Sequence, residues 1–114
     1  MNLRSFLHAF RGIGIATLSE RNMKWHWLAV IIVAIAGWKY ALNVVEWTAV
    51  VLCIALVIGL EMINTVVEKL CNRIQPDRDP DIRDIKDISA GAVLIAAIAS
   101  AIVGLIIFIP KIFA

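Results

Sequence analysis

The sequence predicts an all-α integral membrane protein with three transmembrane helices and an amphipathic surface helix at its N-terminus. Three observations support this fold class. Hydrophobic residues make up 61% of the 114 residues, and the mean hydropathy is +0.87, which is too apolar for a soluble domain of this length. The apolar residues form long stretches, as membrane spans require. Charged residues gather in short segments between these stretches. We expect residues 1–114 to form a single domain.

Residues 1–19 predict the surface helix. Their apolar side chains recur at helical spacing, whereas Arg4, His8 and Arg11 turn to the other side. Such a helix lies in the headgroup layer, with its basic side toward anionic lipid or phosphate. The segment lacks an apolar core followed by a small-residue cleavage site, so we do not expect a cleaved signal peptide.

The first predicted span covers residues 27–45 and follows a charged junction that contains Glu20. Lys39 interrupts this span, so its ammonium must extend to the far interface. His26 lies between two tryptophans and is expected to be an interfacial anchor rather than a metal ligand. A tight turn at residues 43–46 would follow. Aromatic residues mark both ends of the span, as in membrane belts: Trp25, Trp27, Trp38 and Tyr40.

The second and third predicted spans cover residues 47–69 and 88–109. A polar loop with two prolines, residues 71–87, separates them. Nine of the eleven Lys and Arg residues lie before the first span or around this loop, and only Lys39 and Lys111 lie at the other ends of the spans. The positive-inside rule therefore predicts a cytoplasmic N-terminus and a cytoplasmic loop.

Polar residues interrupt the end of the second span along one helical face. Glu61, Asn64, Glu68 and Asn72 fall within roughly a 60° arc, and the two carboxylates lie roughly 10 Å apart along the helix. A carboxylate at the end of an apolar span is costly and indicates a functional site. Two carboxylates and two amides on one face suit a site that holds cations or phosphate.

Several other classes of function have no support. The net charge of only +2 does not indicate a nucleic-acid partner. Cys53 and Cys71 do not form a disulfide framework or a metal-type spacing, and we expect two reduced thiols. The Gly12-Ile13-Gly14 segment is neither a dinucleotide-binding loop nor a P-loop, because no strand precedes it and no Gly-Lys-Ser/Thr follows.

Phosphoryl transfer needs oxygen ligands for Mg²⁺, a cation on the phosphates and a group that orients or deprotonates the acceptor hydroxyl. The residues expected near the cytoplasmic interface match these needs. Glu20, Asn64 and Glu68 suit the metal, Lys86 and Arg4 suit the phosphates, and Glu61 suits an acceptor hydroxyl from the bilayer. By geometry alone, Glu61 could equally be the base, with Glu68 purely a metal ligand.

The segment from Glu61 to Glu68 resembles the Glu-x-x-Asn-Thr/Ser-Ala-x-Glu signature of the small bacterial diacylglycerol kinase and undecaprenol kinase family. Lys86-Asp87 followed by residues 90–94 is similar to the second block of that family. Phe10 to Gly12, and Glu20-Arg21-Asn22 with His26, resemble its N-terminal block. The likeness covers almost the whole chain, with the motifs in order.

This resemblance implies a homotrimer of three-span subunits in the bacterial cytoplasmic (inner) membrane, with ATP–Mg²⁺ as donor and a membrane lipid alcohol as acceptor. It implies that Glu68 is the catalytic base and also lies at the metal, with Glu20 as the second metal-binding acid. The sites would be shared between subunits, so Glu20 and Glu68 could come from different chains. It implies a substrate-binding role for Glu61 and contacts with nucleotide and phosphates for Asn64, Lys86, Asp87 and Arg4.

Three residues depart from the family signature: Val66, Cys71 and Asn72. Val66 and Cys71 should alter packing only. Asn72 replaces the usual acid and so removes a charge near the nucleotide. The pattern Glu20-Arg21-Asn22 with His26, together with Glu46-Trp47, resembles the undecaprenol kinase branch, and it favours undecaprenol over diacylglycerol as the acceptor.

Two other functions remain open at this stage. Membrane carboxylates also mark ion pathways, so a small proton- or cation-coupled transporter is the alternative. It would need Glu61 in the centre of the bilayer and polar groups in both halves of the spans. The chain could also be a non-catalytic packing subunit, in which Glu61 and Asn64 only form hydrogen bonds between helices.

Overall fold

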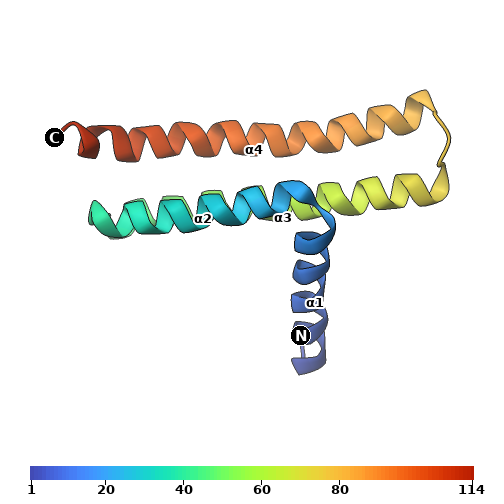
Figure 1. Ribbon diagram of the computed structural model, residues 1–114, viewed down its shortest axis with the longest axis horizontal. Helices are drawn as coiled ribbons and strands as arrows, with labels where there is room; N and C mark the ends of the chain where they lie inside the picture. The colour runs from blue at the N-terminus through green and yellow to red at the C-terminus, as the bar shows by residue number, and fades with distance from the viewer.

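A computed structural model describes residues 1–114 as four α-helices. They are α1 (Leu3–Ser19), α2 (Arg21–Lys39), α3 (Val44–Ile74) and α4 (Pro80–Ile112). α2, α3 and α4 run side by side along the long axis of the molecule, each in the direction opposite to the one before it (Figure 1). α1 crosses them almost at a right angle. The expectation of an all-helical chain is confirmed.

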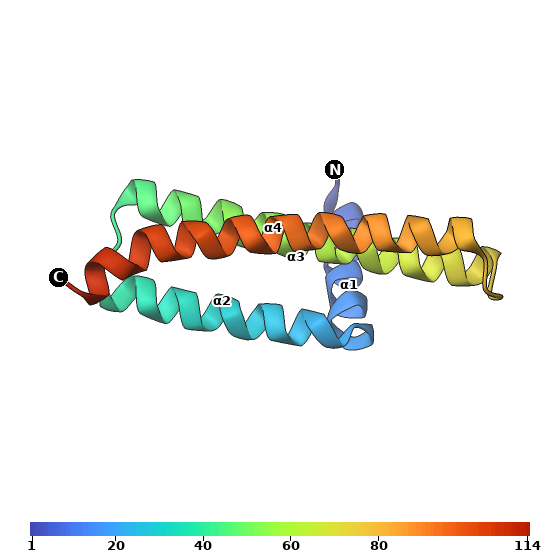
Figure 2. The same cartoon turned by 90° about the horizontal axis from the view of Figure 1, so that it is seen from above.

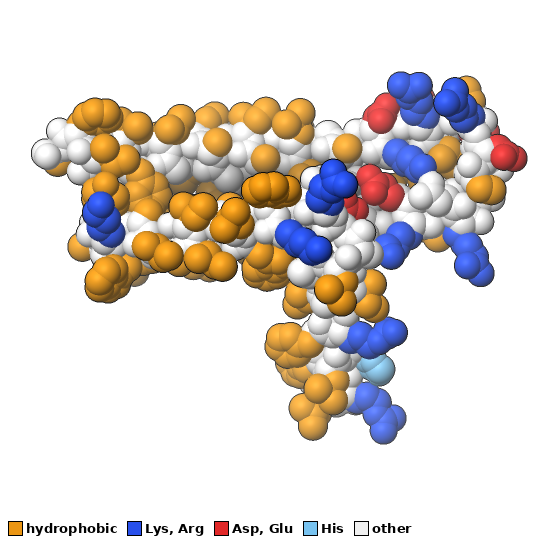
Figure 3. All heavy atoms as spheres, viewed as in Figure 1, with side chains coloured by type: hydrophobic (Ala, Val, Ile, Leu, Met, Phe, Trp, Pro, Cys, Tyr) orange, Lys and Arg blue, Asp and Glu red, His pale blue; other side chains and the backbone are white.

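α1 is capped at its start and fastened to α2 near its end. The side chain of Asn2 accepts a hydrogen bond from the backbone amide of Ser5, which satisfies one of the free donors of the first turn. The indole Nε1 of Trp27 donates to Thr17 Oγ1 at 3.0 Å, which links the two helices across the sharp change of direction. Apolar and basic side chains lie on opposite sides of α1 (Figure 3). Its position at a membrane surface stays a prediction.

The turn between α2 and α3 lies nearer the N-terminus than predicted. We predicted a span over residues 27–45 and a turn at 43–46, but α2 begins at Arg21 and ends at Lys39. Asn43 and Glu46 explain the difference, because they form a capping box that starts α3. Asn43 Oδ1 accepts from the Glu46 amide at 2.8 Å, and Glu46 Oε1 accepts from the Asn43 amide at 3.0 Å. The caps at these two residues therefore fix the helix start at Val44.

The polar segment between α3 and α4 is mostly helical, which contradicts the predicted loop at 71–87. Only residues 75–79 lie outside the helices. The side chain of Asp79 accepts hydrogen bonds from the amides of Asp81 and Ile82, and Pro80 occupies the first turn, where its missing N–H is not needed. Two helices, α3 and α4, are long and apolar enough to cross a membrane. They contain the predicted second and third spans.

The three long helices are held together at the end of the molecule that carries the α2–α3 turn. Leu42, Val50 and Ile107 form a small buried cluster there. Lys111 Nζ lies 3.1 Å from Glu46 Oε1 and ties the end of α4 to the start of α3. α3 and α4 contact each other more extensively than either contacts α2, and α2 diverges from α4 toward its N-terminal end (Figure 2).

Most of the apolar surface is not covered by the chain itself. Only 11 of the 114 residues are buried, and apolar side chains are spread over the visible faces of α2 and α4 (Figure 3). Such continuous apolar surface is typical of proteins that face lipid or a further subunit. Charged side chains gather at the end that carries the α3–α4 turn.

We predict that Gly37→Ala destabilises the fold. A Cβ atom at Gly37 would lie 2.5 Å from Trp47 Cη2, so the indole or the helix would have to move. Overpacking of this kind costs about 1–3 kcal/mol. Thermal unfolding in detergent, followed by circular dichroism, should show a lower midpoint for G37A. Gly14→Ala is the matched control, because no atom lies within 4 Å of its added Cβ. Equal midpoints for both variants would contradict the packing described here.

Candidate functional site

The polar face of α3 is buried for most of its length. Glu61, Asn64 and Thr65 are buried, and Glu68 is half-buried. The Asn64 amide Nδ2 donates to Glu68 Oε1 at 3.4 Å, and the Thr65 hydroxyl donates to the backbone carbonyl of Glu61 at 3.0 Å. The structure therefore brings these side chains together on one face, as their spacing predicted.

Lys86 joins this face from the neighbouring helix. Its ammonium donates a hydrogen bond to Asn72 Oδ1, across the α3–α4 hairpin. Asn72 lies about one turn beyond Glu68 on α3, so the cation sits at the charged end of the polar face. Because the amide of Asn72 carries no charge, it holds the Lys86 side chain without neutralising it.

A polar hollow of about 720 Å³ lies beside Lys86 at the α3–α4 turn. Its lining includes the cations Arg78 and Arg83 and the acids Asp77, Asp79 and Asp87, together with other residues of the turn. The three cations of the lining, Arg78, Arg83 and Lys86, could contact phosphate groups, but the three acids balance their charge.

No hydrogen bond or ion pair links the other predicted site residues to the polar face within one chain. Asp87 is exposed and forms an ion pair with Arg83 at 3.9 Å. Arg4 is exposed on α1, and Glu20 is half-buried between α1 and α2. No group of three or more His, Cys, Asp or Glu side chains is arranged to hold a metal ion. A metal site built on Glu68 and Glu20 therefore stays a hypothesis.

The side-chain oxygen atoms on α3 nevertheless suit the coordination of a magnesium ion. Asn64 Oδ1 is buried and has no hydrogen-bond partner, and it belongs to the same side chain that contacts the Glu68 carboxylate. Magnesium usually takes one or two carboxylates and completes its shell with water and substrate phosphates. Two neighbouring oxygen-bearing side chains are thus enough to hold it on a nucleotide.

His26 is a residue of this region that sequence analysis interpreted differently. We expected an interfacial anchor, but His26 Nε2 lies 3.4 Å from Glu61 Oε2, and the Glu61 side chain is only 4% exposed. The antiparallel arrangement of α2 and α3 could have predicted that His26 and Glu61 lie close together. Counting along α2 and α3 from their shared turn places these two residues within about one helical turn of each other.

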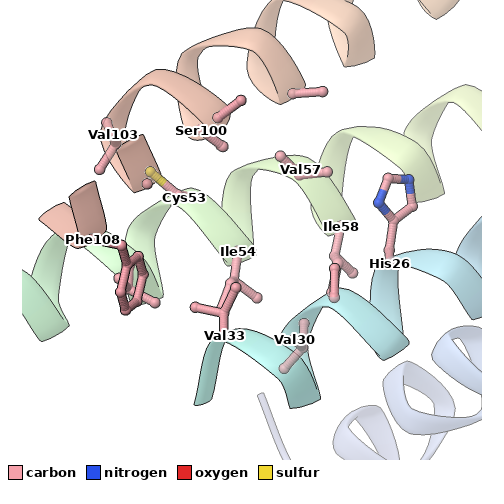
Figure 4. A pocket seen from close by; sticks show the side chains of 15 residues that line it. His26, Val30, Val33, Cys53, Ile54, Val57, Ile58, Ser100, Val103 and Phe108 are labelled. Atoms are coloured by element: carbon pink, nitrogen blue, oxygen red, sulfur yellow. The ribbon is translucent and has the colours of Figure 1, made fainter. Parts of the chain in front are cut away.

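An apolar cavity of about 360 Å³ lies between α2, α3 and α4, on the far side of His26 from the charged end. Its walls are mostly aliphatic, and its labelled lining comes from all three helices (Figure 4). Ser100 contributes the one hydroxyl of the lining, and its Oγ is buried without a partner. The buried carboxylate of Glu61 thus lies between the charged end of the polar face and an apolar cavity that its partner His26 lines.

The sequence profile of the prokaryotic diacylglycerol kinase family matches residues 7–108. This chain belongs to that family. The kinase is therefore a lipid kinase of a bacterial membrane, and its family implies ATP as the phosphoryl donor. Nothing in these comparisons supports the transporter alternative.

Two characterised relatives align with nearly the whole kinase. Undecaprenol kinase of Bacillus subtilis strain 168 is 39% identical over 108 residues, which cover 95% of this chain and 88% of that protein. Diacylglycerol kinase of Synechocystis sp. is 33% identical over 109 residues, which cover 95% of this chain but 62% of that longer protein. No solved structure matches the kinase.

We predict that Lys86→Met lowers kcat/KM for ATP by about 100-fold, because it removes the cation at the end of the polar face. Initial rates at varied ATP concentration measure this effect. Lys69→Met is the matched control, since Lys69 is exposed on α3 and forms no ion pair or side-chain hydrogen bond. Similar losses in both variants would contradict a specific role for Lys86.

Proposed function

We propose that the kinase transfers the γ-phosphoryl group of ATP to the hydroxyl of undecaprenol. The observation that carries this choice of acceptor is the alignment with the Bacillus subtilis undecaprenol kinase, which spans 88% of that protein at 39% identity. The match to the diacylglycerol kinase of Synechocystis is lower, at 33%, and spans 62% of that protein. The apolar cavity lined by His26, the partner of Glu61, also suits an acceptor that is almost entirely hydrocarbon.

In this proposal α2, α3 and α4 all cross the membrane, with the N-terminus and the α3–α4 turn in the cytoplasm. The 19 residues of α2 extend about 28 Å, which is close to the hydrocarbon thickness of a bilayer. The distribution of Lys and Arg supports the orientation. ATP would then approach the polar face from the charged end, and the lipid would approach it from the apolar side.

Each predicted site residue has its own role in phosphoryl transfer. Glu68 takes the proton of the acceptor hydroxyl, whose oxygen bonds to the γ-phosphorus as the bond to the leaving ADP breaks. Asn64 keeps the Glu68 carboxylate in place. Lys86 binds phosphate oxygens, and Arg4 and Asp87 complete the nucleotide contacts. Glu68 and Glu20, with the unpartnered Oδ1 of Asn64, would hold Mg²⁺, which would neutralise charge on the phosphates.

We further propose a homotrimer, in which Glu20 and Glu68 meet across a subunit boundary. Two observations support it. The acids of a single chain do not form a group that could hold a metal ion, and large apolar side chains remain exposed along all three long helices. Association would cover part of this surface and bring α1 of one subunit near α3 of another.

The lipid preference predicts that purified kinase with ATP and Mg²⁺ phosphorylates undecaprenol faster than diacylglycerol in mixed micelles. Transfer of radiolabelled phosphate into extracted lipid measures both rates. Glu68→Gln should lower both by at least about 10³-fold, because it removes the base, without changing the elution volume of the protein. A faster rate on diacylglycerol would contradict the acceptor, and near-normal turnover by E68Q would contradict the role of Glu68.

A further inference from the structure

The carboxylate of Glu61 has one partnered and one unpartnered oxygen. Its Oε2 lies 3.4 Å from His26 Nε2, and its Oε1 is buried with no hydrogen-bond partner. The side chain is only 4% exposed, whereas that of His26 is 24% exposed. Glu61 therefore depends on His26 for the one polar side-chain contact that its carboxylate makes.

The unpartnered oxygen indicates a ligand. An ionised carboxylate accepts hydrogen bonds at both oxygens, and a buried acceptor without a donor is costly, so native structures rarely leave one bare. The nearest side-chain polar contact on α3, from Thr65, goes to the backbone of Glu61 and not to its carboxylate. Oε1 therefore remains open to a donor that comes from outside the chain.

His26 also lines the apolar cavity. Figure 4 shows its ring reaching from α2 toward α3 at the end of the cavity, with Val30 and Ile58 next along the wall. A ligand that enters this cavity and donates to Glu61 needs a hydrogen-bond donor, such as a hydroxyl, on a hydrocarbon body. An isoprenoid alcohol has this form, and the hydroxyl would lie where His26 and Glu61 meet.

We propose that His26 is the positioning residue for the lipid acceptor. Its imidazole holds Oε2 of Glu61 so that Oε1 faces the acceptor hydroxyl and receives its hydrogen bond. The inference rests on the proposed function, because it takes a lipid alcohol as the acceptor. It adds a role for His26, which acts through Glu61 and does not touch the reacting phosphorus.

A positioning role affects lipid binding and leaves nucleotide binding unchanged. We expect His26→Ala to raise KM for undecaprenol at least about tenfold, because the carboxylate loses its orientation, whereas KM for ATP should change less than about twofold. His26→Gln places an amide donor near the same point and should recover most of the lipid affinity. Steady-state rates at varied lipid mole fraction and at varied ATP concentration provide both constants.

The other histidine provides a matched control. His8 is exposed on α1 and forms no ion pair or side-chain hydrogen bond, so His8→Ala should leave both constants unchanged. If H26A keeps the wild-type KM for lipid, or raises both Michaelis constants equally, the inference is overturned. Failure of H26Q to recover any affinity would also overturn it, because packing would then account for the loss.

A second measurement does not depend on activity. The kinase contains two histidines, so the ring nitrogens of histidine-labelled protein give two sets of NMR signals in detergent micelles. Glu61→Gln should shift the signals of His26 and leave those of His8 in place. Unchanged His26 signals would overturn the inference, whatever the kinetic result.

The outcomes separate this inference from the proposed function. If the wild-type kinase phosphorylates neither lipid, the proposed function is wrong, and the NMR signals still report on the pair. If the wild type is active and H26A binds lipid normally, the function stands and the role of His26 is wrong.

Discussion

A carboxylate buried in apolar surroundings is the constraint on which the site depends. Glu61 lies within a helix that is otherwise apolar for most of its length, and its charge is unfavourable there without compensation. His26 supplies part of that compensation from α2. The remaining acceptor capacity of the carboxylate can be satisfied only by something that arrives from outside the chain. In our proposal, the energetic cost of the buried group is thus also the basis for recognising an alcohol.

The arrangement of the helices separates the charged residues from the apolar cavity. α3 and α4 form a hairpin whose short turn is capped on both sides. The polar face of α3 and Lys86 of α4 are linked within this hairpin by the hydrogen bond from Lys86 to Asn72. α2 contacts this hairpin near the α2–α3 turn, where Leu42 and Val50 are buried, and again near its other end, where His26 contacts Glu61. The apolar cavity lies between the three long helices, and His26 lines one end of it. In the proposed function, the charged ligand and the apolar ligand therefore reach these carboxylates from different environments.

Much of this could be predicted from the sequence. The common face of Glu61, Asn64 and Glu68 follows from helical spacing alone, and the apolar stretches locate α3 and α4. The helix ends could not be predicted from hydropathy, because Asn43 and Asp79 set them by hydrogen bonds to the backbone. The partner of Glu61 could not be predicted either, because it depends on how two helices pack. For Arg4, Glu20 and Asp87, a single chain provides no contact with Glu68 that would test the predicted roles.

The central claim is that metal-bound ATP binds at the end of α3 that carries Asn64 and Asn72. Mn²⁺–ATP can replace Mg²⁺–ATP as a paramagnetic probe, and it broadens the NMR signals of nearby side-chain amides in asparagine-labelled protein. Asn43 is the internal reference, since it lies roughly 30 Å from Asn64 along the helix. We expect strong broadening of the Asn64 and Asn72 signals and none at Asn43. Equal broadening at all three residues, or broadening at Asn43 alone, would contradict the account.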